Sequence, residues 1–157
     1  MIAVTGITGF LGVAVYDRLP KAMPYGPQLH GCKVVVHLAG ETKDPRLMYL
    51  SNVLLTKSIL AESGNVHVTR FVFISSMAVK DLEDGYTVSS YAWSKWACEQ
   101  LVKQSSLDTR IVRLPTVYST GMKNWYIMAV KSLLRGQNPW NMISLEEAVS
   151  RILKEAL

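Results

Sequence analysis

A tyrosine and a lysine four positions apart have the spacing required for acid-base chemistry. Tyr91 and Lys95 lie in SSYAWSKWACEQLVKQSS, a stretch of helical character, so their side chains would share one helix face. An ammonium group beside a phenol favours ionised phenol, which could take a proton from a substrate or return it. The pair alone is a weak motif, because a solvated helix face would explain it equally.

Ser76 adds a hydroxyl in a matching place. It ends the apolar run RFVFISS, at residues 70–76, which has the composition of a buried strand. From the carboxyl end of that strand, Ser76 could hydrogen-bond the substrate oxygen whose proton Tyr91 takes or gives.

A glycine-spaced turn, GITGFLG, lies near the start of the chain. Gly6, Gly9 and Gly12 lie where an expected strand, 2–5, gives way to an expected helix, 10–19. Backbone amides at such a helix start can hold a pyrophosphate if no side chain blocks it. An ordinary turn with close helix packing is the alternative.

The elements around these residues alternate between strand and helix. Strands are expected at 2–5, 33–39, 70–76 and 110–115, and helices at 10–19, 45–63, 89–106, 124–134 and 144–157. Ser144 and Glu147 form a capping box for the last helix. This order predicts an α/β fold, a doubly wound parallel sheet of Rossmann-like type with helices on both faces. Ligands of such sheets bind at the carboxyl ends of the strands.

Bulk composition narrows the class of protein. A chain of 157 residues that is 49% hydrophobic suits one compact domain. Its net charge of +5 comes from scattered lysines and arginines, so we expect no nucleic-acid partner, although positive potential could attract an anionic ligand. No apolar run approaches the length of a membrane span and no signal peptide is apparent, which predicts a cytoplasmic protein without membrane contact.

The cysteines and histidines give no sign of a metal site. Cys32 and Cys98 lack metal-ligand spacing and are expected to be buried thiols. His37 and His67 have no partner at a recognisable spacing, so a structural role is expected for both.

Taken together, six segments resemble the extended short-chain dehydrogenases/reductases of the NAD-dependent epimerase/dehydratase type. They are TGITGFLG, HLAG (37–40), Asn52 with Val53, FVFISSMAV, YAWSK and RLPTVY, in the order that the family has. The resemblance implies an enzyme that uses NAD or NADP as its cofactor. It also implies a homodimer formed through the helices at about 45–63 and 89–106.

The resemblance assigns roles to particular residues. The implied catalytic residues are Ser76, Tyr91 and Lys95, and the implied substrate-binding residues are Ser76, Tyr91 and Thr116. The implied cofactor-binding residues are Gly6, Gly9, Phe10, Leu11, Gly12, Leu38, Ala39, Gly40, Asn52, Ser75, Tyr91, Lys95 and Pro115.

The choice of reaction within the family rests on few residues. Met77 follows Ser76 where dehydratases usually have an acidic residue. A dehydratase is therefore a less favoured prediction than an epimerase or a reductase. RLPTVYSTGMKNW looks most like nucleotide-sugar 4-epimerases, with 4-keto-reductases as the alternative and a nucleotide sugar as the implied substrate. A truncated, non-catalytic dinucleotide-binding module is the rival interpretation.

The chain also departs from the family pattern. Lys33, Thr116, Ser119 and Thr120 stand where the family usually has Asp, Asn and a Gly-Pro pair. The segments 20–33 and 136–144 are short, and the first has no acidic residue near position 26 to contact a ribose.

We therefore expect one NAD(P)-binding domain over 1–157 that lacks internal segments. About 116–157 would be a remnant of the substrate-binding part. Internal deletions, an engineered fragment and a longer chain of which segments are missing would each explain the short segments, and we favour the third.

Overall fold

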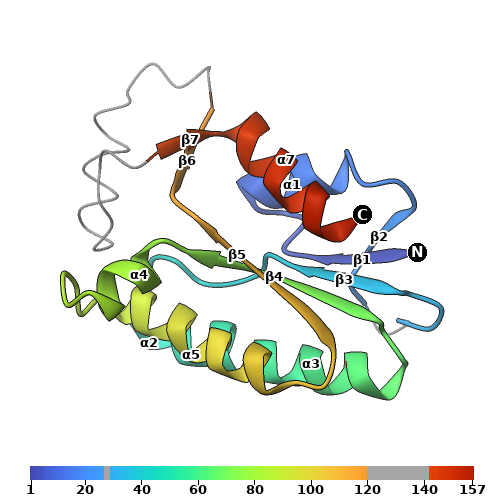
Figure 1. Ribbon diagram of the computed structural model, residues 1–157, viewed down its shortest axis with the longest axis horizontal. Coiled ribbons are helices and arrows are strands. Elements are labelled where there is room, and N and C mark those ends of the chain that lie inside the picture. Colours follow the sequence, from blue (N-terminus) through green and yellow to red (C-terminus); the bar gives the residue numbers. More distant parts are fainter. Residues whose placement is uncertain (27–28, 120–141) are drawn as a thin grey trace.

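The computed structural model describes residues 1–26, 29–119 and 142–157. Its centre is a five-stranded parallel sheet in the order β2-β1-β3-β4-β5 (Figure 1). The strands are β1 (Ile2–Thr5), β2 (Ala22–Pro24), β3 (Val34–His37), β4 (Arg70–Ser76) and β5 (Asp108–Leu114). The predicted parallel sheet is confirmed.

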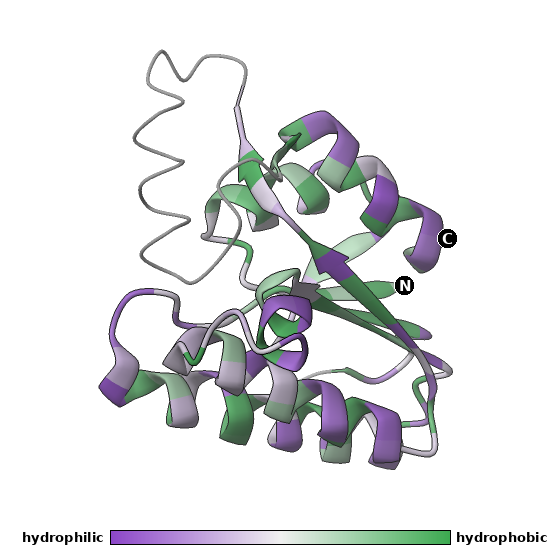
Figure 2. Ribbon diagram, turned by 60° about the vertical axis from the view of Figure 1, so that its left-hand side comes forward, coloured by the Kyte–Doolittle hydropathy of each residue, from purple (hydrophilic) through white to green (hydrophobic). Residues whose placement is uncertain are grey.

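Helices cover both faces of this sheet. In Figure 1, α1 (Phe10–Tyr16) and α7 (Leu145–Ala156) lie on one face, and α3 (Leu55–Asn65) and α5 (Ser90–Gln104) lie on the other. Ser144 caps α7 by accepting a hydrogen bond from Glu147 N at 3.1 Å, as one half of a capping box does. The strands between the two layers are mainly hydrophobic (Figure 2), as expected for a sheet buried on both sides.

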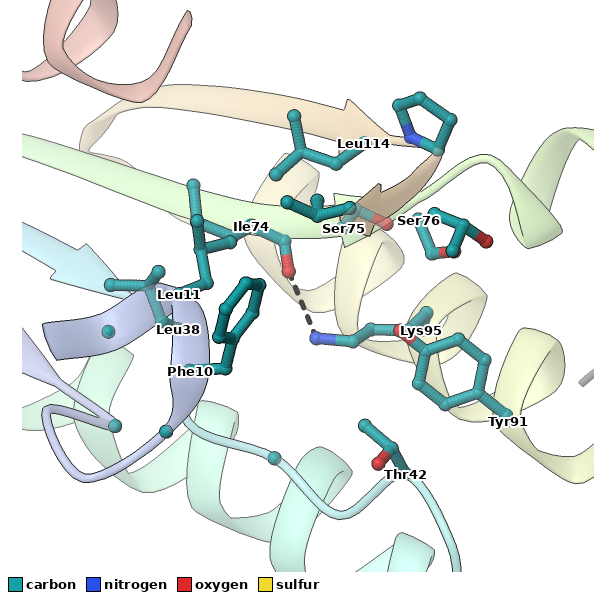
Figure 3. A pocket seen from close by; sticks show the side chains of 17 residues that line it. Phe10, Leu11, Leu38, Thr42, Ile74, Ser75, Ser76, Tyr91, Lys95 and Leu114 are labelled. Atoms are coloured by element: carbon teal, nitrogen blue, oxygen red, sulfur yellow. Dashed lines mark hydrogen bonds between the residues drawn. The ribbon is translucent and has the colours of Figure 1, made fainter. Parts of the chain in front are cut away.

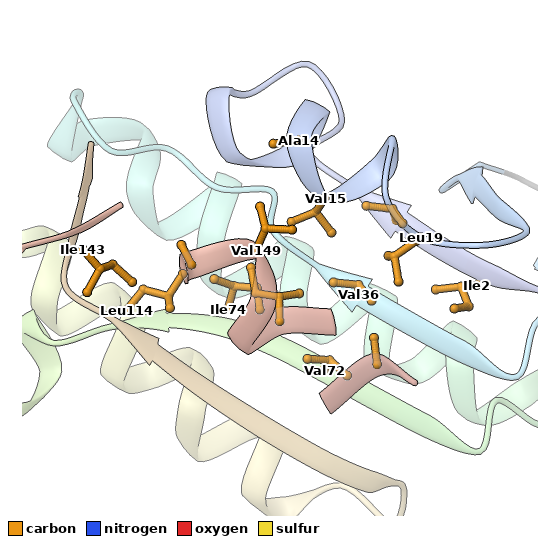
Figure 4. Close-up of a cluster of buried hydrophobic side chains, with 14 residues drawn as sticks. Ile2, Ala14, Val15, Leu19, Val36, Val72, Ile74, Leu114, Ile143 and Val149 are labelled. Atoms are coloured by element: carbon orange, nitrogen blue, oxygen red, sulfur yellow. The ribbon is translucent and has the colours of Figure 1, made fainter. Parts of the chain in front are cut away.

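Side chains along β4 alternate between two hydrophobic cores. Val72 and Ile74 pack in the core under α1 and α7 (Figure 4), whereas Phe71 and Phe73 pack in the core under α3 and α5. The alternation follows from the two-residue period of a strand. It also decides that Ser75, two residues after Phe73, faces α5.

The predicted helix over 45–63 contains a wide turn. Its parts are α2 (Pro45–Met48), a π-helical segment η1 (Tyr49–Leu54) and α3. A π-helical turn accommodates an extra residue and often marks a functional site. Here it carries Asn52, which is buried.

Four elements were not predicted because each is short. They are β2, α4 (Ala78–Glu83), and the two strands of a small parallel sheet, β6 (Thr116–Tyr118) and β7 (Met142–Ser144). Periodicity cannot identify strands of three residues. The first helix ends at Tyr16 rather than at position 19, since the chain turns at Lys21, which has a φ of 57°, to enter β2. The helix predicted over 124–134 lies outside the described residues.

The helices of the described ranges are short compared with the thickness of a bilayer. None of them is long and apolar enough to span a membrane.

Candidate active site

A cavity of about 450 Å³ opens at the carboxyl ends of the strands. It lies where the strand order reverses, because the chain passes from β1 to β2 on one side and β3 pairs with β1 on the other. Such switch points are the usual ligand sites of open α/β sheets. The glycine turn after β1 and the loop after β3 form one side of the cavity, and the ends of β4 and β5 with α5 form the other.

The glycines are required by close backbone approaches. A Cβ atom at Gly12 would lie 1.9 Å from the carbonyl oxygen of Gly6. Gly6 has a φ of +71°, and a Cβ there would lie 2.7 Å from Ala39 N. Gly9, the N-cap of α1, places no side chain over the first turn. The glycine side of the cavity can therefore receive a phosphate group at backbone distance, which fits a dinucleotide.

A buried histidine joins the two loops that form this side. Thr5 Oγ1 lies 2.7 Å from His37 Nδ1 and accepts hydrogen bonds from Leu38 N and Ala39 N, both at 3.0 Å. Because those bonds occupy the hydroxyl oxygen, its proton points to Nδ1, and the imidazole proton is on Nε2. Nε2 then donates to Thr56 Oγ1 at 2.9 Å. His37 is thus held as one neutral tautomer, in agreement with the structural role expected for it.

Asn52 is hydrogen-bonded to the loop that follows β3. Its Oδ1 accepts from Glu41 N at 2.6 Å, and its Nδ2 donates to Glu41 O and to Ser94 Oγ, at 3.0 and 2.9 Å. Ser94 Oγ in turn donates to Tyr91 O. The π-helical turn therefore ties the 38–41 loop to the helix that carries Tyr91 and Lys95.

The three predicted catalytic residues line this one cavity. Lys95 is buried, its Nζ donates to Ile74 O at 2.9 Å, and it lies 4.9 Å from the centre of the Phe73 ring. Figure 3 shows the ammonium directed toward β4 and the Tyr91 ring directed the opposite way. A buried ammonium needs an acceptor, which the Ile74 carbonyl supplies. Ser76, at the end of β4, accepts from Ala78 N through its hydroxyl at 3.2 Å.

The structure brings together most of the predicted site. Of the predicted cofactor and substrate residues, only Ala39 and Asn52 are not among the residues that line the cavity. Sequence reasoning missed Thr42, Ile74, Leu114 and Val117, which do line it. These four residues lie within or next to the segments HLAG, FVFISS and RLPTVY, so their positions in the sequence could have indicated them.

The adenosine end of a dinucleotide would extend toward β2. The residues at the carboxyl end of that strand are Pro24, Tyr25 and Gly26, so the acidic ribose contact is missing from this end of the strand. Tyr25 donates a hydrogen bond to Glu62, and burial together with this carboxylate raises the pKa of Tyr25. NAD and NADP therefore both remain compatible with the site.

A doubly wound parallel sheet with a glycine turn at its switch point defines a dinucleotide-binding protein. The model of the family described as NAD(P)H-binding matches residues 21–155. The chain belongs to this NAD(P)H-binding family, and the cofactor it binds is NAD or NADP.

Sequence comparison also finds similarity to a reductase. Ceramide reductase of Caulobacter vibrioides (strain NA1000 / CB15N) is 32% identical over 117 residues, which cover 73% of this chain and 33% of that protein. The chain thus spans about a third of the length of this relative.

Solved structures confirm the Rossmann-like fold that the order of strands and helices predicted. UDP-galactose 4-epimerase superposes with a TM-score of 0.73 at 20% identity, over 97% of this chain and 70% of that one. The dTDP-4-dehydrorhamnose reductase of Bacillus anthracis str. Ames, in complex with NADP, gives 0.65 at 20% identity, over 83% and 58%. MoeE5 in complex with UDP-glucuronic acid and NAD gives 0.73 at 18%, over 99% and 71%.

Proposed function

We propose that this chain carries the NAD(P)-binding and catalytic part of an oxidoreductase that acts on a carbon bearing a hydroxyl or keto oxygen. The single observation that carries the proposal is that Ser76, Tyr91 and Lys95 line the same cavity as the glycine turn. A module freed from catalysis has no physical need for these three groups in one cavity.

Each of the three side chains has a distinct task in the proposed reaction. Tyr91 takes the proton from the substrate hydroxyl or returns it to a keto oxygen. Ser76 hydrogen-bonds that oxygen and orients it. Lys95 has three N–H donors, of which Ile74 O takes one, and it places a positive charge on the wall of the same cavity. The nicotinamide, when bound, supplies or accepts the hydride.

For the substrate, we propose a nucleotide sugar and an epimerase reaction. The fold shared with UDP-galactose 4-epimerase and MoeE5 supports this class. Met77 beside Ser76 provides no carboxylate for elimination of water, which argues against a dehydratase. A reductase is the second candidate, and the 32% identity to ceramide reductase favours it.

The two candidates differ in their use of cofactor. We expect the purified chain with UDP-galactose and catalytic NAD to form UDP-glucose, seen by chromatography, with no net change in nicotinamide absorbance. A reductase would instead consume NADH or NADPH in proportion to a keto substrate. Binding of NAD(P)H with neither reaction would favour the non-catalytic module.

We also propose that the chain forms a homodimer through α2, η1 and α5. Large hydrophobic side chains of these elements are exposed at Leu47, Tyr49, Leu50, Leu54, Trp93 and Trp96. Exposed apolar side chains concentrated on neighbouring helices are typical of a protein-protein interface, and two copies could cover them mutually.

Light scattering after size exclusion tests the dimer. We expect a mass near twice 17.5 kDa for the chain, and a return to about the monomer mass when Leu50 and Trp93 are both replaced by Lys. A Tyr86→Lys variant, changed at a residue that is 83% exposed outside these elements, should stay dimeric. A monomeric wild type would contradict the proposal.

A further inference from the structure

An ionic cluster lies beneath the wall of the cavity, where β4 and β5 end. The Glu99 side chain of α5 is buried and accepts hydrogen bonds from Ser75 Oγ at 2.7 Å and from Arg113 Nε and Nη2 at 2.8 and 2.7 Å. Arg113 also donates to both oxygens of Glu83, at 2.8 and 2.9 Å. One guanidinium therefore joins α4, α5 and β5, and Glu99 joins them to β4.

Three members of the cluster, Ser75, Glu99 and Arg113, lie in or close to the cavity wall. Ser75 lines the cavity itself, and Glu99 lies one helical turn after Lys95. Arg113 directly precedes Leu114 and Pro115, which line the cavity too. A shift of any of these three residues would move part of the wall.

The cluster is chemically costly, which argues for a specific role. Burial disfavours the charged form of Glu99, but the hydrogen bonds from Arg113 and Ser75 outweigh it and leave the pKa of Glu99 below its usual value. Apolar side chains of similar volume would often hold four elements together as well as a buried ion pair does. What they lack is the directional, two-pronged contact of a guanidinium with a carboxylate.

We propose that Glu99 and Arg113 are positioning residues of the NAD(P)H site, which hold the ends of β4 and β5 and the Lys95 turn of α5 at the spacing that the cofactor requires. Neither residue contacts the cofactor in this proposal. Their effect passes through Ser75, Lys95 and Pro115. The inference rests on the cofactor site and is independent of the reaction proposed above.

Cofactor titration of variants tests the inference. NADH and NADPH are titrated into the full chain, and binding is followed by quenching of tryptophan fluorescence and by the emission spectrum of the bound nicotinamide. We expect Glu99→Gln to weaken binding of the preferred nucleotide about ten-fold, because the wall loses its alignment. Arg113→Lys keeps the charge but not the two-pronged contact, so we expect a similar loss. The Arg113→Lys variant also tests the inference independently if Glu99→Gln does not fold.

The same two strands offer a matched control at their other end. Arg70 of β4 and Asp108 of β5 are paired in register, with Nε and Oδ2 2.9 Å apart, far from the cavity. Asp108→Asn should lower the unfolding temperature modestly and leave cofactor affinity unchanged. Wild-type affinity in Glu99→Gln or Arg113→Lys would overturn the proposal, as would an affinity loss in Asp108→Asn equal to theirs. Failure of the wild-type chain to bind either nucleotide would overturn it as well.

These measurements separate the inference from the proposed reaction. They use binding alone, so a chain without turnover can still support the role of Glu99 and Arg113. Conversely, turnover that depends on Tyr91 would stand even if Glu99→Gln bound cofactor normally.

Discussion

Replacing Tyr91 with Phe is expected to lower kcat for conversion of UDP-galactose to UDP-glucose by about 10²–10⁴-fold, the usual contribution of a positioned acid-base group. The substitution removes only the hydroxyl that would exchange the substrate proton. The ring, which lines the cavity, stays. Affinity for NAD or NADP should therefore change little, so the loss would appear in kcat rather than in cofactor binding.

A matched control is available on the same chain. Tyr86 is 83% exposed and does not line the cavity, so Tyr86→Phe should keep wild-type turnover. If wild-type turnover persists in Tyr91→Phe, the assignment of Tyr91 as acid-base group is wrong, although the cofactor site would stand. Chromatography of the product and nicotinamide fluorescence of the bound cofactor give the two readouts separately.

Acidification is expected to unfold the chain in part through His37. Burial, and secondarily the charge of Lys95, lower the pKa of His37 to about 3 from a usual value of 6.5. The unfolded chain therefore binds a proton in this range that the folded chain does not. The stability due to neutral His37 is present above pH 6.5 and is lost as the pH falls toward 3. The loss amounts to about 2 kcal/mol by pH 5 and approaches about 5 kcal/mol near pH 3.

Urea unfolding at several pH values checks this prediction. A His37→Gln variant cannot titrate, so its free energy of unfolding should fall less between pH 7 and pH 5 than that of wild type, by about 2 kcal/mol. His30 is exposed, and His30→Gln should keep the pH dependence of wild type. An identical pH dependence in wild type and His37→Gln would show that the buried imidazole does not resist protonation.

Through the Thr5–His37–Thr56 contacts, protonation of His37 would also affect the cavity. Protonation of His37 at Nδ1 would place a proton against the hydroxyl proton of Thr5, whose oxygen already accepts from Leu38 N and Ala39 N. The loop after β3 and the glycine turn would then lose their common anchor. We therefore attribute to His37 the alignment of the two loops on the glycine side of the cavity.

Much of the site could be predicted because it depends on local patterns. The four-residue spacing of Tyr91 and Lys95 indicates a shared helix face, and the position of Ser76 at the end of an apolar run indicates a strand end. In a parallel sheet the carboxyl ends of all strands meet at one edge, so residues at those ends converge whatever the details of packing. The short strand β2 was not predicted, because three residues are too few to show a recognisable period.

The sequence by itself determined the fold class, since strand and helix periods are local properties. Through its resemblance to a known family it also indicated the cofactor class and most of the residues around the cavity. Only the tertiary structure decided how those residues are held. That Lys95 donates to Ile74 O, that His37 is a neutral tautomer between two threonines, and that Arg113 joins Glu83 to Glu99 all depend on strand register and helix packing. These contacts join residues 14 to 32 positions apart, and spacing along the chain does not specify which distant groups meet.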